Sequence, residues 1–410
     1  MGESRPRTTR RGVCCRSGRH DGKYQVSFRA AETQFHEEAS RACGLDDFGD
    51  DDYLEGLRTL LAALDDEAPL NEIGRAMFRA NIVAALVGRL QSEHGWSTHP
   101  EHAEAAIDGP LVIMGLPRTG TTALQHLLAQ DPSLQALELW ISTSPKPRLP
   151  RARWQEDPDF RACDERMRVL HANSPDLMAI HPMAAHLPDE CWHLTTQHFA
   201  HSGYEAQTHV PSYSRWWEGY DMGPAWRRHR RNLQLIGYRE PQRRWLLKDA
   251  TYLFHLDAFM GVYPDARVVM THRDPVKLIP SVCSLCWALR NPTNEGLDKV
   301  AFGRAELDLW DRAIHIAMQV REAHDPAQFY DQHFKAFQRD PLATIGDIYD
   351  YFDLRYDEAA DTAIRAFRTE NPPGKHGAHS YTLEEWGLEA GEIRERFADY
   401  CERYDVEPEP

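Results

Sequence analysis

The sequence predicts an α/β protein built on a parallel sheet, with a helical pair before the sheet and a helical insertion within it. Residues 111–130 and 245–271 carry this prediction, because each contains a short apolar run, a turn and an amphipathic segment. Two strands that are each followed by a helix indicate parallel pairing. With 410 residues, the chain is long enough for a large buried core.

Helical spacing of leucines and other apolar residues predicts the N-terminal pair, and the dense histidine, proline and aromatic content of residues 145–240 indicates a separate insertion. In chain order, we expect helices within 51–96, a strand at 111–114, a helix at 121–130, a mostly helical insertion at 145–240, strands at 245–247 and 266–271 flanking a helix at 251–262, and helices near 303–323 and 341–352.

The division of the chain follows from this order. We predict a disordered leader at 1–50 and one domain at 51–410, with N-terminal helices in 51–106 and an acceptor-side insertion in 145–240. The aromatic residues of the insertion either wall an apolar pocket or pack the insertion onto the sheet. These residues are Trp192, Tyr204, Tyr213, Trp216, Trp217, Tyr220 and Trp226.

Charge and composition limit the class of protein. The 63 acidic and 47 basic residues give a formal charge of -16, which argues against a general nucleic-acid or anionic-membrane binder. No apolar run approaches the roughly 20 residues of a membrane span, and the first 30 residues lack the apolar stretch of a secretion signal. We therefore expect a cytoplasmic protein without a transmembrane segment.

The eight cysteines are scattered along the chain. Only Cys283 and Cys286 have the spacing of a redox or metal pair, and no second such pair would complete a four-thiolate site. The sequence therefore favours buried core cysteines and no metal site.

The stretch LVIMGLPRTGTTALQHLL at 111–128 predicts a strand, a loop bounded by Gly115 and Gly120, and a helix. It nearly matches the G-x-x-x-x-G-K-[ST] loop of nucleoside-triphosphate enzymes, but Thr121 stands at the lysine position. Amide groups and a helix N-terminus at such a loop suit an anion. The alternative is a tight turn without a ligand.

The side chains of this loop favour the anion. Arg118 supplies a cation, and Thr119, Thr121 and Thr122 supply hydroxyl donors. Without the lysine, three phosphates and Mg²⁺ would be poorly held. We expect a shorter anion that protein cations neutralise directly.

Two further stretches fall at the carboxyl ends of predicted strands, where open α/β sheets bind ligands. Lys248 directly follows the strand at 245–247, and Arg273 follows the strand at 266–271. Arg273 and Ser281 could converge on a second phosphate. The alternatives are a solvated lysine, an arginine–aspartate pair and a serine that packs within a helix.

With these motifs in order, the chain resembles the sulfotransferases that use 3′-phosphoadenosine 5′-phosphosulfate (PAPS), in particular a bacterial branch with the loop LPRTGTT. The similarity covers about residues 51–406. The resemblance implies a three-layer P-loop-like fold with a central parallel sheet, PAPS as sulfuryl donor, 3′,5′-phosphoadenosine (PAP) as product, and no metal.

The resemblance also implies roles for individual residues. The loop would hold the 5′-phosphosulfate, the Arg-x7-Ser pair and a late loop would hold the 3′-phosphate, and a tyrosine in the stretch FYDQHF would lie near the adenine. These residues are Arg118, Thr119, Gly120, Thr121 and Thr122 for the phosphosulfate, Arg273, Ser281, Lys375, His376 and Gly377 for the 3′-phosphate, and Tyr330 for the adenine.

In the cytosolic animal sulfotransferases, the catalytic base is a histidine two residues after the lysine that corresponds to Lys248. This chain has Ala250 at that position, so its base must come from elsewhere. The resemblance to tyrosylprotein and glycan sulfotransferases points to Glu138, with Glu190 in reserve and a histidine of the insertion as a third possibility. Pro188, Asp189 and Glu190 also suit the first turn of a helix.

The expected reaction is in-line sulfuryl transfer to a hydroxyl of a small molecule, lipid or glycan, with Arg118 and Lys248 stabilising the departing oxygen. The rival hypotheses are an ATP- or GTP-dependent kinase or NTPase, and a non-catalytic nucleotide-binding protein of the same fold. The sequence leaves the acceptor and the oligomeric state open.

Overall fold

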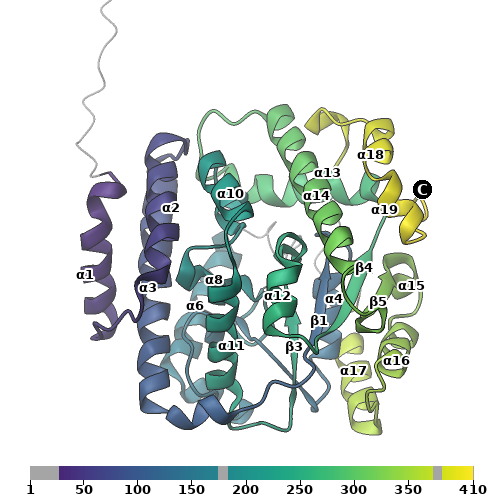
Figure 1. The fold of residues 1–410 in the computed structure, drawn as a ribbon, viewed down its shortest axis with the longest axis horizontal. Helices are drawn as coiled ribbons and strands as arrows, with labels where there is room; N and C mark the ends of the chain where they lie inside the picture. Colours follow the sequence, from purple (N-terminus) through teal and green to yellow (C-terminus); the bar gives the residue numbers. More distant parts are fainter. Residues whose placement is uncertain (1–26, 174–182, 373–380, 410) are drawn as a thin grey trace, which may run out of the picture.

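A five-stranded parallel sheet in the order β2-β3-β1-β4-β5 lies at the centre of the protein (Figure 1). The structure is a computed structural model that describes residues 27–173, 183–372 and 381–409. Because the five strands run parallel, their carboxyl ends meet at one edge of the sheet, where ligands of open α/β sheets bind. The strands are β1 (Leu111–Gly115), β2 (Leu134–Ala136), β3 (Arg244–Lys248), β4 (Arg267–His272) and β5 (Phe329–His333).

Alternate residues along each strand contact helices on opposite faces of the sheet. On one face, Ile113, Leu246 and Val269 pack into an apolar cluster with α4 (Thr121–Leu128), α16 (Pro341–Tyr351) and α17 (Glu358–Glu370). On the other face, Val112, Leu247 and Met270 belong to the larger core, with α11 (Gly223–Gly237), α12 (Leu256–Val262) and α14 (Lys299–Arg321). The three layers, helix, sheet and helix, confirm the predicted fold class.

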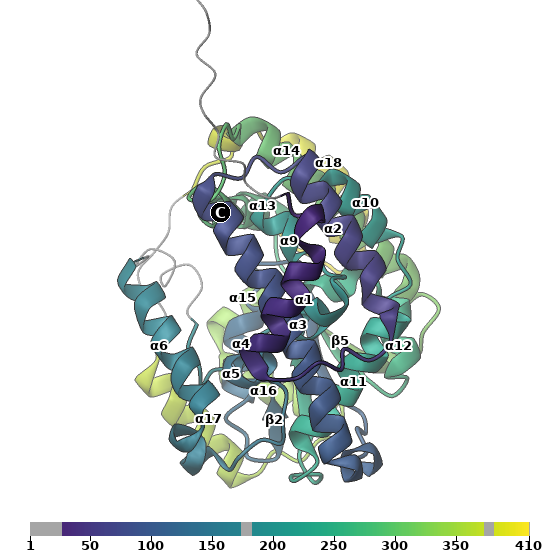
Figure 2. The ribbon, with the colours of Figure 1, turned by 90° about the vertical axis from the view of Figure 1, so that its left-hand side faces the viewer.

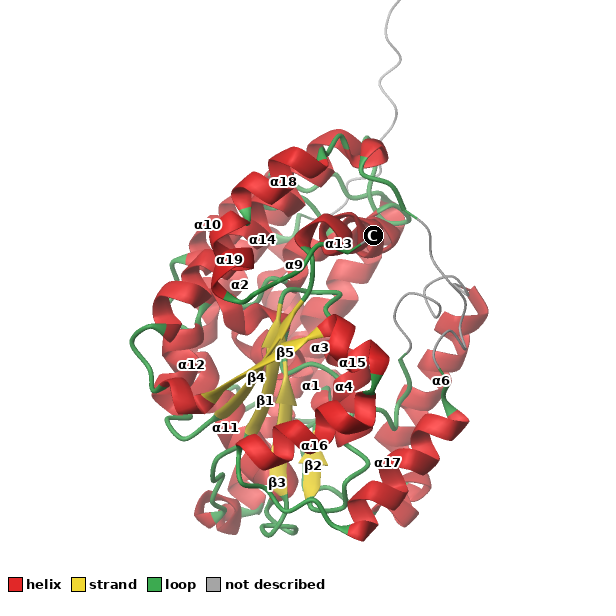
Figure 3. Cartoon of the chain, turned by 90° about the vertical axis from the view of Figure 1, so that its right-hand side faces the viewer, coloured by secondary structure: helices red, strands yellow, loops and turns green. Residues whose placement is uncertain are grey.

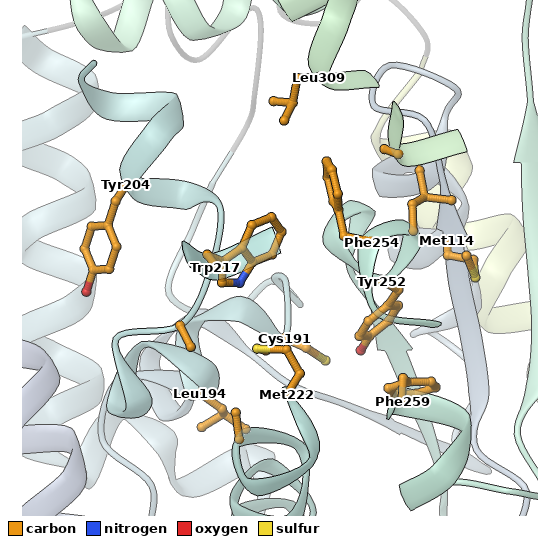
Figure 4. Close-up of a cluster of buried hydrophobic side chains, with 14 of the residues drawn as sticks. Met114, Cys191, Leu194, Tyr204, Trp217, Met222, Tyr252, Phe254, Phe259 and Leu309 are labelled. Atoms are coloured by element: carbon orange, nitrogen blue, oxygen red, sulfur yellow. The ribbon is translucent and has the colours of Figure 1, made fainter. Parts of the chain in front are cut away.

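Part of the larger core gathers around Trp217 and Phe254 (Figure 4), whose rings meet edge to face with centroids 5.0 Å apart. Within the insertion, the described aromatics Tyr204, Tyr213 and Trp226 are likewise no more than 2% exposed. These side chains pack the insertion onto the body of the protein, as one of the two alternatives predicted. The α-helices of the described part of this region are α6 (Pro158–Asn173), α8 (Trp192–Thr195), α9 (Gly203–Gln207), α10 (Pro211–Glu218) and α11, and the short helix α5 (Leu139–Ser142) precedes it.

The N-terminal helices α1 (Glu32–Cys43), α2 (Leu54–Asp66) and α3 (Glu72–Thr98) stand on the side of the molecule away from β5 (Figure 1). Helix α1 lies along α3 (Figure 2) and buries Phe35 and Ala39 in the larger core. The prediction of a disordered leader at 1–50 is therefore wrong for residues 27–50. Apolar residues at helical spacing, Phe28, Ala31, Phe35 and Ala39, carried a signal that the polar composition of the leader masked.

Strands β2 and β5 were not predicted. Strand β2 has three residues, too few for a periodic pattern, and β5 has the polar sequence FYDQH of an edge strand. The predicted helix at 251–262 is a 3-10 helix at Ala250–Phe254 followed by α12. The remaining helices are α13 (Pro275–Arg290), α15 (Phe334–Arg339), α18 (Ala390–Arg396) and α19 (Ala398–Arg403).

None of the helices in the described ranges combines the length and the apolar composition that a membrane span requires. In the same ranges, no three histidine, cysteine or carboxylate side chains group as metal ligands would.

Candidate active site

The glycine-bounded loop joins β1 to α4 and takes backbone conformations that few residues adopt. Arg118 has a φ of 69° and Gly120 a φ of 93°, both in the left-handed region. Gly120 directly precedes α4, so the loop turns its amide groups and the helix N-terminus toward the carboxyl edge of the sheet. This local geometry is that of an anion-binding loop.

The hydroxyl of Thr119 fastens the loop to the sheet. Its Oγ1 donates to the carbonyl oxygen of Leu116 at 2.6 Å and lies 2.6 Å from Oγ1 of Thr271 on β4. Because Thr119 is fully buried, its hydroxyl belongs to the support of the loop. Gly120, Thr121 and Thr122, in contrast, line a cavity.

Arg118, Arg273 and Ser281 come together, although they come from three separate elements. Nε of Arg118 donates to Oγ of Ser281 at 3.1 Å, and Nη1 of Arg273 donates to the carbonyl oxygen of Arg118 at 3.0 Å. The guanidinium of Arg273 also stacks on the Phe334 ring, 4.1 Å from its centroid. Burial lowers the pKa of Arg118, and the charge of Arg273 lowers it further. Two cations thus lie at this edge, and the carboxylate of Glu409, which accepts from Nε of Arg273 at 3.0 Å, offsets part of their charge.

Lys248 ends β3 and is paired with Glu190. Its Nζ donates to Oε1 of Glu190 at 2.6 Å, with the lysine side chain only 2% exposed. The next residue, Asp249, is fully buried, and burial followed by the charge of Glu190 raises the pKa of its carboxyl to about 7. Lys248 is therefore a desolvated cation whose charge Glu190 balances.

Glu138 lies at the carboxyl end of β2, directly before α5, and both of its carboxylate oxygens accept from Nη1 of Arg148, at 3.0 and 2.8 Å. Arg148 also donates to the carbonyl oxygen of Ala136 at 2.8 Å. Both side chains are buried and both line the cavity. Arg148 thus fixes the position of Glu138 and balances its charge.

The segment at 185–191 brings Glu138 and Glu190 to the same edge of the sheet. The amide of Asp189 donates to the carbonyl oxygen of Leu137 at 2.9 Å, and that of Cys191 donates to the carbonyl oxygen of Lys248 at 3.0 Å. The segment therefore crosses the carboxyl ends of β2 and β3. Glu190 reaches Lys248, 58 residues away in the chain, because of this crossing.

A cavity of about 1190 Å³ opens beside the loop and α4. Its walls come from loop and α4 residues, from Glu138 and Arg148, from α15, and from the facing helices α6 and α17, which lie side by side in Figures 2 and 3. The loop and α4 residues are Arg118, Gly120, Thr121 and Thr122. Leu149, Trp154, Met183, Leu187 and Phe367 give it an apolar wall. This volume exceeds that of a usual site for one small molecule.

The predicted site residues differ in their relation to this cavity. Arg273 lines the cavity. Among the described residues, Lys248, Glu190 and Ser281 do not line it. Tyr330 is on β5, half-buried, with its ring 5.3 Å from that of Tyr351. Lys375, His376 and Gly377 fall outside the described residues.

Three residues of the site were missed in the sequence. Arg148 follows the irregular stretch SPKP, Phe334 begins a short helix, and Glu409 follows α19. Arg148 and Glu409 belong to no motif, Phe334 ends the stretch FYDQHF without a role of its own there, and none of the three stands at the end of a predicted strand. Their contacts with Glu138 and Arg273 arise only from tertiary packing.

The fold and the site together define a class of protein. A parallel sheet whose first loop, cations and helix N-terminus face a large cavity at the carboxyl edge is the arrangement of an enzyme that binds a phosphorylated substrate.

Comparison with known proteins identifies the family. Residues 110–358 match the sulfotransferase family, and the chain belongs to it. Sulfotransferase STF1 of Mycobacterium tuberculosis H37Rv has a TM-score of 0.84 at 40% identity, over 91% of this chain and 100% of that one. For sulfotransferase STF9 of Mycobacterium avium the TM-score is 0.85 at 25% identity, over 95% and 99%.

A curated relative extends the comparison. The omega-hydroxy-beta-dihydromenaquinone-9 sulfotransferase Stf3 of Mycobacterium bovis is 24% identical over 324 residues, 75% of this chain and 79% of that protein. The resemblance to the PAPS-dependent sulfotransferases is thereby confirmed, and the protein is a sulfotransferase. The kinase, NTPase and non-catalytic alternatives are not favoured.

Proposed function

We propose that this enzyme transfers the sulfuryl group of PAPS to the hydroxyl of a small molecule, lipid or glycan, and releases PAP. The observation that carries the proposal is one cavity that both the anion-binding loop, with Arg118 and Thr122, and the carboxylate of Glu138 line. A donor anion and a proton acceptor for the hydroxyl would then share one enclosed space.

In this proposal the loop and its cations hold the phosphosulfate. The bond between sulfur and the bridging oxygen breaks as a bond forms between sulfur and the acceptor oxygen, and negative charge develops on the bridging oxygen. Arg118, Lys248 and the amides at the start of α4 stabilise that charge in a desolvated site. Because the sulfuryl group itself carries a single negative charge, these cations suffice without a metal.

Arg273 and Ser281 would receive the 3′-phosphate, since a guanidinium and a hydroxyl on adjacent elements provide several donors to one anion. Arg118 contacts both Ser281 and Arg273, and this shared contact supports a common role for the two residues. Lys375, His376 and Gly377 are proposed to complete the 3′-phosphate site, and Tyr330 is proposed to lie near the adenine. We retain a cytoplasmic location as a prediction from charge and composition.

For the base we propose Glu138, with Glu190 as the alternative. Glu138 lines the cavity that the acceptor would enter, and Arg148 holds its carboxylate in place. Glu190 instead pairs with Lys248 at 2.6 Å, an arrangement that suits the orientation of the lysine. In either case the carboxylate takes the hydroxyl proton as the acceptor oxygen bonds to sulfur.

A lipid or another largely apolar alcohol is the acceptor class that we favour. The wall of Leu149, Trp154, Met183, Leu187 and Phe367 would take an apolar body, and Stf3 carries the name of a menaquinone-derived acceptor. The volume of about 1190 Å³ leaves room for such a body beside the donor.

The test is transfer of radioactive sulfur from PAPS to a panel of alcohols, quinols and sugars. We expect Arg118→Met and Lys248→Met to lower kcat at least about 100-fold, the scale of removing one oxyanion-stabilising group. Arg304→Met, an exposed change on α14, is the control and should keep the wild-type rate. Turnover of ATP with Mg²⁺, and none of PAPS, would overturn the proposal.

The base is tested separately with two isosteric changes. Glu138→Gln should lower kcat about 100-fold or more with little change in PAP affinity, because general-base catalysis contributes about 10²–10⁴-fold. If Glu138→Gln keeps the wild-type kcat and Glu190→Gln does not, Glu190 is the base.

A further inference from the structure

Glu409 forms an ion pair with Arg273, the arginine that the proposed function assigns to the 3′-phosphate of the nucleotide. Nε and Nη2 of Arg273 donate to the two carboxylate oxygens of Glu409, at 3.0 and 3.2 Å. The pair is largely shielded, with 16% of the arginine and 15% of the glutamate side chain exposed. This forked contact uses the edge of the guanidinium that binds carboxylates and phosphates bidentately.

Beyond Val406, hydrogen bonds and ion pairs connect the segment that carries Glu409 to the rest of the protein. Val406 is buried, but Glu407 and Pro408 are exposed. The amide of Glu409 donates to a carboxylate oxygen of Asp274 at 2.8 Å, and Nζ of Lys335 contacts Glu407 and the carbonyl oxygen of Pro408 at 3.2 and 2.8 Å. Because Glu407 and Pro408 are exposed and the Lys335 contacts lie at the surface, the free-energy cost of detaching segment 407–409 comes mainly from breaking the Arg273–Glu409 pair.

The charge balance explains why a carboxylate lies at this position. Arg273 donates to the carbonyl oxygen of Arg118, and, besides burial, the charge of Arg273 lowers the pKa of Arg118, so the two guanidinium groups repel each other. Glu409 supplies a negative charge to this pair. A phosphate group would supply a stronger one, and two anions on one edge of Arg273 would repel each other.

We propose that Glu409 is a built-in competitor for the 3′-phosphate of the nucleotide and thereby sets the affinity of the donor site. This inference rests on the proposed function, in that Arg273 is the cation for the 3′-phosphate. Binding of PAPS or PAP displaces the carboxylate, and segment 407–409 moves away from Arg273. Nucleotides without a 3′-phosphate leave the Arg273–Glu409 pair intact.

One consequence concerns turnover. Because the carboxylate competes equally with donor and product, it weakens PAP as well as PAPS. A return of Glu409 to Arg273 then assists the departure of PAP, a step that limits the rate of many enzymes.

Isothermal titration of the full chain with PAP and with adenosine 5′-monophosphate tests the proposal. Glu409→Gln should lower the Kd for PAP about 3- to 10-fold, the scale of one partly shielded ion pair, and leave the Kd for adenosine 5′-monophosphate unchanged. Glu407→Gln, an exposed neighbour that contacts Lys335, is the matched control and should change neither Kd more than about twofold.

A double mutant gives the second line of the test. In an Arg273→Met background, Glu409→Gln should no longer change PAP affinity, because the two residues act through each other. An unchanged or raised Kd for PAP in the Glu409→Gln single variant would overturn the inference and leave the sulfotransferase function intact. Failure of wild type and every variant to bind PAP would instead contradict the proposed function.

Discussion

A buried carboxyl group in α14 makes the stability of this protein depend on pH. Glu306 is fully buried, and its Oε2 accepts from Nε1 of Trp310 at 3.1 Å. Burial is the main cause that raises the pKa of this carboxyl to about 7. The charge of Glu205 acts in the same direction, and Arg290 and the Trp310 hydrogen bond act against it. The change to test is Glu306→Gln, which keeps an acceptor for Trp310 and removes the charge.

The sign and the size of the effect follow from linkage. The pKa is raised from 4.5 to about 7, so between these values the folded chain keeps a proton that the unfolded chain releases, and stability falls as pH rises. Above pH 7 the full destabilisation is present. About 2.5 pH units at about 1.36 kcal/mol each give about 3 kcal/mol. With an unfolding entropy of about 2.1 cal/mol/K per residue over 410 residues, this corresponds to about 4 °C in Tm.

The assay is thermal and denaturant unfolding of wild type and variant from pH 5 to pH 8. Glu306→Gln should match the wild type within about 1 kcal/mol at pH 5 and exceed its stability by up to about 3 kcal/mol at pH 8. Glu402→Gln, an exposed change on α19, should shift neither. If Glu306→Gln were less stable than wild type at pH 8 and had the same pH dependence as wild type, the folded-state pKa of Glu306 would not be raised and the reasoning would be wrong.

Three further outcomes are expected. Gly120→Ala should weaken PAP binding by about 1–2 kcal/mol in a titration, since φ is 93° and the new Cβ would lie 3.0 Å from Phe334; unchanged affinity would contradict the strain argument. Arg148→Met should destabilise the protein by about 3–5 kcal/mol in urea, because it leaves Glu138 buried and unpaired, and adding Glu138→Gln should restore most of the loss. Asp249→Asn should raise Tm at pH 8 more than at pH 5, because burial raises the pKa of Asp249 to about 7; an equal shift at both pH values would contradict this.

The elements that the sequence predicted correctly are those whose pattern is local. Strands β1, β3 and β4 are continuous apolar runs, as both of their faces are covered, and each is followed by a recognisable turn or helix. Strands β2 and β5 lie at the edges of the sheet and owe their existence to pairing with β3 and β4. Such strands carry too few buried side chains for a pattern to identify them.

The residues of the candidate site likewise differ in whether a local sequence pattern or a tertiary contact determines their surroundings. The positions of Arg118 and Lys248 at the carboxyl edge were predictable, because Arg118 belongs to the loop after β1 and Lys248 is the last residue of β3. Ser281 and Glu190 were also predicted at the site, but their contacts with Arg118 and Lys248 were not, since these contacts arise only through the packing of distant segments. Sequence order can place a residue at an edge of the sheet, whereas tertiary contacts determine its neighbours.

In the structure, Thr121 stands where a triphosphate-binding loop would have its lysine, and Arg118 supplies the cation of the loop instead. A lysine at position 121 would stand at the start of α4, beside the phosphates of a nucleoside triphosphate. The cation here is Arg118, whose left-handed backbone conformation places its side chain against Ser281 and its carbonyl oxygen against Arg273. The positive charge of the loop is thereby shifted toward β4, and in the proposed function it lies between the phosphosulfate and the 3′-phosphate. Such a loop favours a ligand with anionic groups at two separate points over one with a single long phosphate chain.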